Sequence, residues 1–242
     1  MVVKSVLADL MVEYHTLHEK VEKQLKEYLS DFPRPDLLFE IKQADIDEER
    51  LIDIEGASRR NDRMLEITVA FRKFAEKLPM FDGVVFHSCL IGVEDRAIAF
   101  SASSGTGKTT HMLRWQKILG DKLTVLNGDK PILRFVDGKL YGYGSPWMGK
   151  EWLGCNKKAP LTDVCKIERS KINKTEPMSK EEGILLLMQQ IYMPYDPQMR
   201  LKTIDLIYKV AEKVNFWKIR CNMDIEAAEI SYKAIFGENN EQ

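Results

Sequence analysis

The sequence predicts a mixed α/β fold in which helices flank a mixed, largely antiparallel sheet. Two pairs of apolar, β-rich segments are separated by turns of two residues, which is the spacing of β-hairpins. The first pair is residues 84–93 and 96–102, and the second pair flanks Asp137-Gly138. Between the two hairpins, a glycine-rich segment leads into a helical pattern. Because parallel strands need long crossover connections, these hairpins argue against a purely parallel sheet.

The composition is that of one folded main domain with an appendage. The 242 residues are 44% hydrophobic, which is enough for one sizeable core. The 36 basic and 37 acidic residues nearly cancel, so the chain lacks the strongly basic balance that favours nucleic acid. No nucleic-acid partner is expected.

Cysteine spacing and hydropathy indicate a reduced, soluble protein. The four cysteines show neither CxxC pairing nor the spacing of metal ligands. No stretch of about 18 apolar residues exists to span a membrane, and charges interrupt the first apolar run too early for a signal peptide. We therefore expect free thiols, a cytoplasmic location and no membrane partner.

The N-terminal segment predicts a long amphipathic helix. Between residues 3 and 29, apolar or aromatic side chains recur at spacings that alternate between four and three, and the pattern ends before Pro33. We therefore divide the chain into this helix, residues 1–33, and a main domain, residues 34–242. The helix has two interpretations: it forms the interface of a homodimer, or it packs one apolar stripe on its own domain. The second is the more usual role of such a stripe.

Several other segments carry clear local signals. Ser179 with Glu182 forms a capping box, and Asp196 with Pro197 opens the next helix. Residues 142–160 are rich in Gly, Lys and Trp and predict a mobile loop or lid. The remaining predictions are strands at residues 37–41, 123–127, 164–169 and 215–221, helices at residues 63–77 and 106–120, and a loop at residues 42–62.

The glycine-rich segment ASSGTGKTT, residues 102–110, has the composition and context of a phosphate-binding loop. It lies between an apolar strand and a helix, whose N-terminus adds partial positive charge. Gly105 and Gly107 allow the backbone to turn successive N–H groups onto phosphate oxygens. Lys108 supplies a full charge for the β and γ phosphates, and Thr109 places a hydroxyl for Mg²⁺. The predicted nucleotide-binding residues are Ser103, Ser104, Gly105, Thr106, Gly107, Lys108, Thr109 and Thr110.

One position departs from the strict loop pattern. GxxxxGK[ST] has a glycine where this chain has Ala102, so one alternative is a Gly/Ser turn that happens to precede a helix. We favour the phosphate-binding loop because both later glycines, the lysine and the hydroxyl remain in a strand-to-helix context. The segment therefore predicts a nucleoside triphosphate and Mg²⁺ as ligands.

Three features together resemble the HPr kinase/phosphorylase and phosphoenolpyruvate carboxykinase superfamily. They are the SGTGKTT loop, a histidine fifteen residues before Ala102, which is His87, and an aspartate at a strand end about twenty residues after Lys108, which is Asp129. The resemblance covers roughly residues 80–155. It implies the phosphate-loop fold of that superfamily, ATP and Mg²⁺ as cofactors, and phosphoryl transfer as the activity.

The resemblance also implies roles for individual residues. Lys108 would hold the phosphates, and Thr109 and Asp129 would bind Mg²⁺. Asp129 or His87 would take the proton of the acceptor hydroxyl, with Asp129 favoured. Glu151, in the segment SPWMGKEWLG, matches the region where related serine kinases carry a carboxylate near the reacting groups.

Three hypotheses for the function follow. The leading one is an ATP- and Mg-dependent kinase that transfers the γ-phosphoryl group to a hydroxyl of a small molecule, peptide or protein, with serine favoured. Gly128 stands where the family has the first of two paired aspartates, which weakens the case for phosphorolysis and for full metal coordination. Together with Ala102, this departure supports a second hypothesis, a nucleotide-binding regulatory protein of the same fold with weak turnover. The third is an unrelated phosphate-loop NTPase, which a fully parallel sheet would select.

Overall fold

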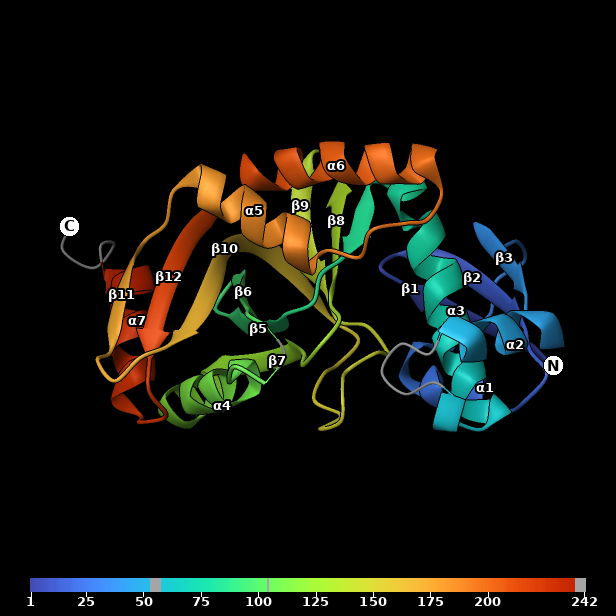
Figure 1. The fold of residues 1–242 in the computed structure, drawn as a ribbon, viewed down its shortest axis with the longest axis horizontal. Helices are drawn as coiled ribbons and strands as arrows, with labels where there is room; N and C mark the ends of the chain where they lie inside the picture. Colours follow the sequence, from blue (N-terminus) through green and yellow to red (C-terminus); the bar gives the residue numbers. More distant parts are fainter. Residues whose placement is uncertain (53–57, 104, 238–242) are drawn as a thin grey trace. The chain divides into compact units, whose positions relative to one another are not determined.

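The chain forms two compact units, Met1–Leu78 and Pro79–Gln242, in a computed structural model that describes residues 1–52, 58–103 and 105–237 (Figure 1). The predicted division was after residue 33. Each unit has its own sheet and its own buried side chains. Within the described ranges, no helix combines the length and the hydropathy needed to cross a membrane.

The N-terminal unit is a three-stranded sheet with helices. Its elements are β1 (Val2–Leu7), β2 (Leu10–His15), α1 (Lys20–Gln24), β3 (Leu37–Glu40), α2 (Gln43–Ile52) and α3 (Asp62–Lys77). Strand β2 is central, antiparallel to β1 and parallel to β3. The predicted strand at residues 37–41 and helix at residues 63–77 are confirmed. The predicted loop at residues 42–62 is wrong over α2, which buries only Ile46 and Glu49 and therefore shows no apolar stripe in the sequence.

The predicted amphipathic helix over residues 3–29 is wrong over β1 and β2, because two periods fit the apolar residues there, and its later part holds the short helix α1 and a 3-10 helix, Lys26–Tyr28. Val3, Leu7, Leu10 and Tyr14 fall at spacings of four and three, as on a helix, and also on alternate positions of β1 and β2. Ser5 and Val12 are buried as well, which completes a period of two. Ala8 and Asp9, with φ of 50° and 62°, form a two-residue turn between the strands. The idea of a homodimer interface was based on that long helix, so it loses its basis.

The C-terminal unit is built on a nine-stranded sheet. Its strands are β4 (Gly83–Val85), β5 (Cys89–Val93), β6 (Arg96–Ser101), β7 (Leu123–Asn127), β8 (Ile132–Val136), β9 (Lys139–Tyr143), β10 (Lys158–Arg169), β11 (Lys174–Pro177) and β12 (Asn215–Cys221). Its α-helices are α4 (Lys108–Leu119), α5 (Lys180–Gln190), α6 (Pro197–Ala211) and α7 (Glu226–Phe236). Strand β10 pairs in parallel with β6 and β12, and the other pairs are antiparallel. The predicted mixed α/β class, with a largely antiparallel sheet, is confirmed.

Both faces of this sheet are buried, each under a different pair of helices (Figure 1). On β6, Ala97 and Ala99 face the core that α5 and α6 cover, whereas Ile98 and Phe100 face the core that α4 and α7 cover. Alternate residues of a strand point to opposite faces, so a strand buried on both faces is apolar throughout. This explains the continuous apolar run that precedes the glycine-rich loop.

Both predicted hairpins are present, with one correction. Strand β5 pairs with β6 and β8 with β9, and the second turn has φ of 49° at Asp137 and 74° at Gly138, as a type I′ turn requires. The predicted run at residues 84–93 is split, because β4 pairs with β8 while β5 pairs with β6 and β7. His87 lies in the gap between β4 and β5. A residue in such a gap is not tied to the alternation of either strand.

Candidate functional site

The predicted phosphate-binding loop joins the end of β6 to the start of α4. Gly105 and Gly107 have φ of 73° and 121°, in the region that favours glycine. An added Cβ at either glycine would meet no described atom within 4 Å, so backbone conformation, and not space, calls for glycine here. The backbone N of Thr106 donates to the carbonyl of Ser103 (3.2 Å). Ser104, another predicted loop residue, lies outside the described residues.

This loop accepts hydrogen bonds from an arginine that the sequence analysis did not identify as part of the site. Arg169, the last residue of β10, donates from Nη2 to the Gly105 carbonyl (2.5 Å) and from Nε to the Thr106 carbonyl (3.3 Å). Strand β10 lies parallel to β6 with Lys166 opposite Ser101, so Arg169 extends beyond the end of β6 and reaches the loop. These hydrogen bonds therefore hold the loop backbone in place from β10.

Lys108, the first residue of α4, is buried beneath the loop with 8% of its surface exposed. Its Nζ donates to the Ala102 carbonyl (3.3 Å) and lies 3.1 Å from Nε2 of His87. Burial lowers the pKa of Lys108, and the negative charge of Asp129 opposes that change. A partly desolvated ammonium group gains strongly from an anionic partner, so this position suits a phosphate.

His87 stands between a cation and a carboxylate. Its Nε2 lies 3.1 Å from Nζ of Lys108 and 3.4 Å from Oδ1 of Asp129. On the other side of the ring, Nδ1 lies 3.0 Å from Oε1 of Gln190. The backbone is held as well, since His87 N donates to the Gln190 carbonyl (2.9 Å) and Oγ of Ser101 donates to the His87 carbonyl (3.0 Å). The ring position is thus fixed from three elements.

Asp129 lies in the turn between β7 and β8. The buried Asn127 side chain shapes this turn, because its Oδ1 accepts from the backbone N of Asp129 (2.8 Å) and of Lys130 (2.7 Å). Lys130 Nζ donates to Oδ2 of Asp129 (2.6 Å). Burial acts to raise the pKa of Asp129, but the contact with His87 and the charge and hydrogen bond of Lys130 outweigh it and lower the pKa to about 2. The carboxylate is therefore ionised at neutral pH, as a Mg²⁺ ligand must be.

The loop between β9 and β10 brings Glu151 to the same place. It spans residues 144–157, somewhat less than the predicted 142–160. An added Cβ on Gly149 would lie 3.0 Å from Cβ of Asp129 and 3.7 Å from Oε2 of Glu151. Gly149 has a φ of 81°, which turns the chain at this point. Asp129 and Glu151 therefore both lie close to Gly149.

Gly128 is required by tight packing against this loop. An added Cβ would lie 2.9 Å from the carbonyl oxygen of Met148 and 3.2 Å from that of Leu153. Both are backbone atoms, which cannot move aside as the end of a side chain can. The turn therefore has room for the Asp129 side chain and none for a second aspartate before it.

Thr109, the other predicted Mg²⁺ ligand, lies in the first turn of α4 with Thr110. Its Oγ1 is 4.0 Å from Sγ of Cys89, a buried thiol whose pKa burial raises to about 12. In the part of the chain that the structure describes, no three His, Cys, Asp or Glu side chains gather as a metal site. Mg²⁺ typically binds one or two protein oxygens and completes its shell with phosphate oxygens and water. Thr109 and Asp129 fit that requirement.

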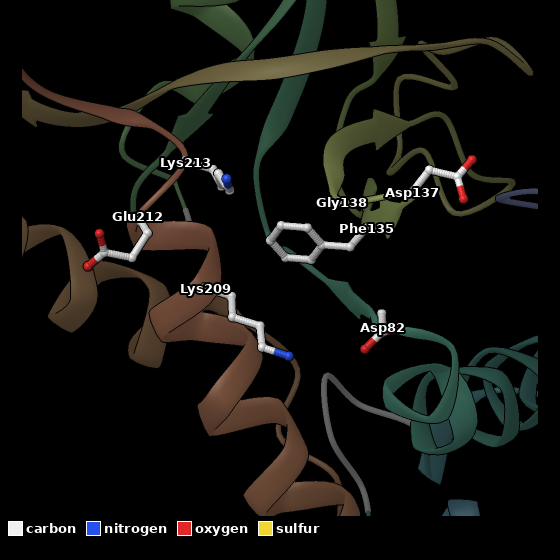
Figure 2. Close-up of a pocket in the computed structure, with 7 residues that line it drawn as sticks. All are labelled: Asp82, Phe135, Asp137, Gly138, Lys209, Glu212 and Lys213. Atoms are coloured by element: carbon white, nitrogen blue, oxygen red, sulfur yellow. The ribbon is translucent and has the colours of Figure 1, made fainter.

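A hollow of about 470 Å³ lies elsewhere in the unit (Figure 2). Asp129 precedes β8 and Asp137 follows it, so one strand length, roughly 17 Å, separates this hollow from the site. Lys209 of α6 points toward the side of the hollow where Phe135 and Asp82 lie, whereas Glu212 points away from it (Figure 2). Its lining residues are Asp82, Phe135, Asp137, Gly138, Lys209, Glu212 and Lys213. None of these belongs to the cluster around His87.

The structure thus joins His87, Lys108 and Asp129 by direct contacts and sets Glu151 beside them. Sequence reasoning missed Gln190 and Arg169. Gln190 is 103 residues from His87 in the chain, so no local motif links the two. For Arg169, the one available signal was its place at the end of a predicted strand.

Comparison with known proteins gives a weak structural likeness. No protein-family model matches the chain, and no curated protein matches it in sequence. Among solved structures, the Hpr(Ser) kinase/phosphatase from Coxiella burnetii aligns with a TM-score of 0.36 and 8% sequence identity, over 64% of this chain and 99% of that chain. A likeness of this size carries no argument about function, which rests instead on the geometry of the site.

Proposed function

We propose that the chain is an ATP- and Mg-dependent phosphotransferase that transfers the γ-phosphoryl group to a hydroxyl, with serine, free or in a peptide or protein, as the favoured acceptor. The observation that carries the proposal is the convergence of Lys108, His87 and Asp129 where a glycine-rich loop enters a helix. The largely antiparallel sheet supports a fold of the HPr kinase and carboxykinase type over an ordinary parallel-sheet phosphate-loop NTPase.

Charge neutralisation is the main demand of phosphoryl transfer. Lys108 and the N-terminus of α4 would bind the phosphates, and Arg169 would keep the loop in shape. Thr109 and Asp129 would hold Mg²⁺, which neutralises charge on the phosphate oxygens. Glu151, which lies near Gly149 and Asp129, would add a second carboxylate near the reacting groups.

His87 is the better proton acceptor of the two candidates. With a pKa of about 2, Asp129 holds protons weakly and suits a metal ligand. Lys108 donates to Nε2 of His87 in the structure, but a triphosphate offers the ammonium stronger, anionic acceptors. Nε2 would then accept the hydroxyl proton, a step that contributes about 10²–10⁴-fold in general base catalysis.

One observation favours a second candidate, a nucleotide-binding regulatory protein with weak turnover. The backbone carbonyls around Gly128 leave the turn with a single aspartate, so the metal has fewer charged ligands than a paired site would supply. Tight Mg-ATP binding together with unchanged ATP under all conditions would select this candidate.

The proposal is tested by ³¹P NMR of the purified chain with Mg-ATP, alone and with free serine, a serine peptide or a cell extract. We expect a new phosphoester signal that disappears in Lys108→Ala and in Asp129→Asn. Lys117→Ala, an exposed lysine on the same helix, is the matched control and should retain the signal. ATP that stays intact with every acceptor would contradict the kinase proposal.

A further inference from the structure

Gln190 holds the His87 ring on the side away from Lys108 and Asp129. It is the last residue of α5, and its Oε1 lies 3.0 Å from Nδ1 of His87. The backbones are joined too, because His87 N donates to the Gln190 carbonyl (2.9 Å). Next to this contact, Phe86 and Ile191 form a β-bridge. The end of α5 is thereby tied to the segment that carries His87.

These contacts determine which ring nitrogen of His87 bears hydrogen. A carboxamide oxygen only accepts, so Nδ1 must donate to Oε1 of Gln190. In a neutral imidazole the other nitrogen, Nε2, then keeps a free lone pair. Lys108 Nζ, which only donates, lies 3.1 Å from that nitrogen. Gln190 and Lys108 therefore require the same tautomer.

Asp129 favours the opposite tautomer of the His87 ring. Its Oδ1 lies 3.4 Å from Nε2 and, as a carboxylate, only accepts. Without the oxygen of Gln190, Lys108 alone would oppose this carboxylate, and the share of the tautomer with hydrogen on Nε2 would rise. That tautomer has no lone pair facing Lys108 and Asp129, where the reacting groups would bind. The contact with Gln190 therefore adds to that of Lys108 in favouring Nδ1–H over Nε2–H.

We infer that Gln190 is a positioning residue that fixes the Nδ1–H tautomer of His87 and so keeps Nε2 available as the proton acceptor. The inference rests on the proposed phosphotransferase function for its catalytic consequence. The tautomer itself is a property of the chain alone. The two parts can therefore be tested separately.

The tautomer is tested by ¹⁵N–¹H spectra of the full chain labelled at histidine, with the His87 signals identified by their loss in His87→Asn. Gln190→Met keeps the side-chain length without the amide oxygen, whereas Gln190→Glu keeps an oxygen acceptor. Gln189→Met changes the exposed neighbour as the matched control. We expect Nδ1–H in wild type, Gln190→Glu and Gln189→Met, and a clearly larger fraction of Nε2–H in Gln190→Met.

The catalytic consequence is tested by kinetics with Mg-ATP and a degenerate serine-centred peptide mixture. We expect kcat to fall about tenfold or more in Gln190→Met with KM for ATP unchanged, and to recover in Gln190→Glu. Nε2–H in the wild type, an unchanged tautomer in Gln190→Met, or a changed tautomer with unchanged kcat would each overturn the positioning role. Absence of transfer by the wild type would overturn the proposed function and its catalytic consequence, while the spectra still decide the tautomer.

Discussion

His87 and His111 lie in the same unit, both next to the phosphate-binding loop, and have opposite surroundings. His111 is on α4, three residues after Lys108, and is only 3% exposed. Its Nε2 accepts from Nε1 of Trp115 (3.2 Å) and lies 3.1 Å from Oγ of Ser231 on α7. His87 contacts charged groups of both signs, and 34% of its side chain is exposed.

The difference separates a structural histidine from a candidate catalytic one. Burial lowers the pKa of His111 to about 4, so its ring is neutral at physiological pH and links α4 to α7 through uncharged partners. His87 has an ammonium and a carboxylate at one ring nitrogen and solvent access for reactants. Changes around His87 should therefore alter chemistry, and changes at His111 should alter stability.

The largest effect is expected at Asp129, the carboxylate in contact with His87. Asp129→Asn removes the ionised metal ligand while keeping the size of the side chain, so we expect phosphoryl transfer to fall about 100-fold and to need more Mg²⁺. The measurement is the initial rate over a Mg²⁺ titration. Asp137→Asn, at the other end of β8, is the matched control and should behave as wild type. Equal rates in Asp129→Asn and wild type would remove Asp129 from the site.

The next largest effect is expected at His111, the structural histidine, and concerns the pH dependence of stability. Because the folded-state pKa of His111 is below its unfolded value of about 6.5, the unfolded chain binds a proton first as pH falls. The contribution of His111 to stability is therefore complete above pH 6.5 and is lost between pH 6.5 and 4. We expect a loss of about 2 kcal/mol between pH 7.5 and pH 5, measured by urea unfolding.

His111→Gln isolates this contribution. Its amide oxygen can still accept from Trp115, but the side chain does not titrate, so the variant should lack that part of the pH dependence. Its rate of phosphoryl transfer at neutral pH should stay within about twofold of wild type, because none of the side chains proposed to bind ATP or Mg²⁺ is changed. The same pH dependence in both proteins would show that His111 is not its source.

The smallest effect concerns the turn that carries Asp129. Gly128→Ala places a Cβ against two backbone carbonyls and should destabilise the chain by about 1–3 kcal/mol. Gly92→Ala is the matched control, because its added Cβ meets its nearest atom at an ordinary 3.7 Å. Thermal unfolding of the two variants measures the difference. Equal stability in both would mean that the loop between β9 and β10 packs less tightly on Gly128 than the structure has it.

Local signals predicted much of the fold, and the errors have a common physical cause. The hairpin at Asp137-Gly138 and the helix caps at Ser179 and Asp196 depend on neighbours in the chain, and all are present. The prediction for the N-terminal hairpin was wrong because the spacing of its apolar residues fits a helix as well as two strands. Strand β2 also pairs with β3, about twenty-five residues away, and a contact at that distance cannot be read from local spacing.

The site shows the same division between local and distant information. The loop motif, His87 and Asp129 could be named from the sequence because each has a characteristic neighbour or spacing. Gln190 and Arg169 act through contacts between elements far apart in the chain, which no motif records. The close packing at Gly128 likewise depends on a loop whose path the sequence does not define.

The central claim is that the loop before α4 binds Mg-ATP through Lys108. Calorimetric titration of Mg-ATP into wild type, Lys108→Ala and the exposed control Lys117→Ala tests it most directly. Binding to wild type and Lys117→Ala, with affinity lowered about 100-fold in Lys108→Ala, is the predicted result, because a charge-assisted contact at a partly buried site is lost. Undiminished binding by Lys108→Ala, or no binding by the wild type, would contradict it.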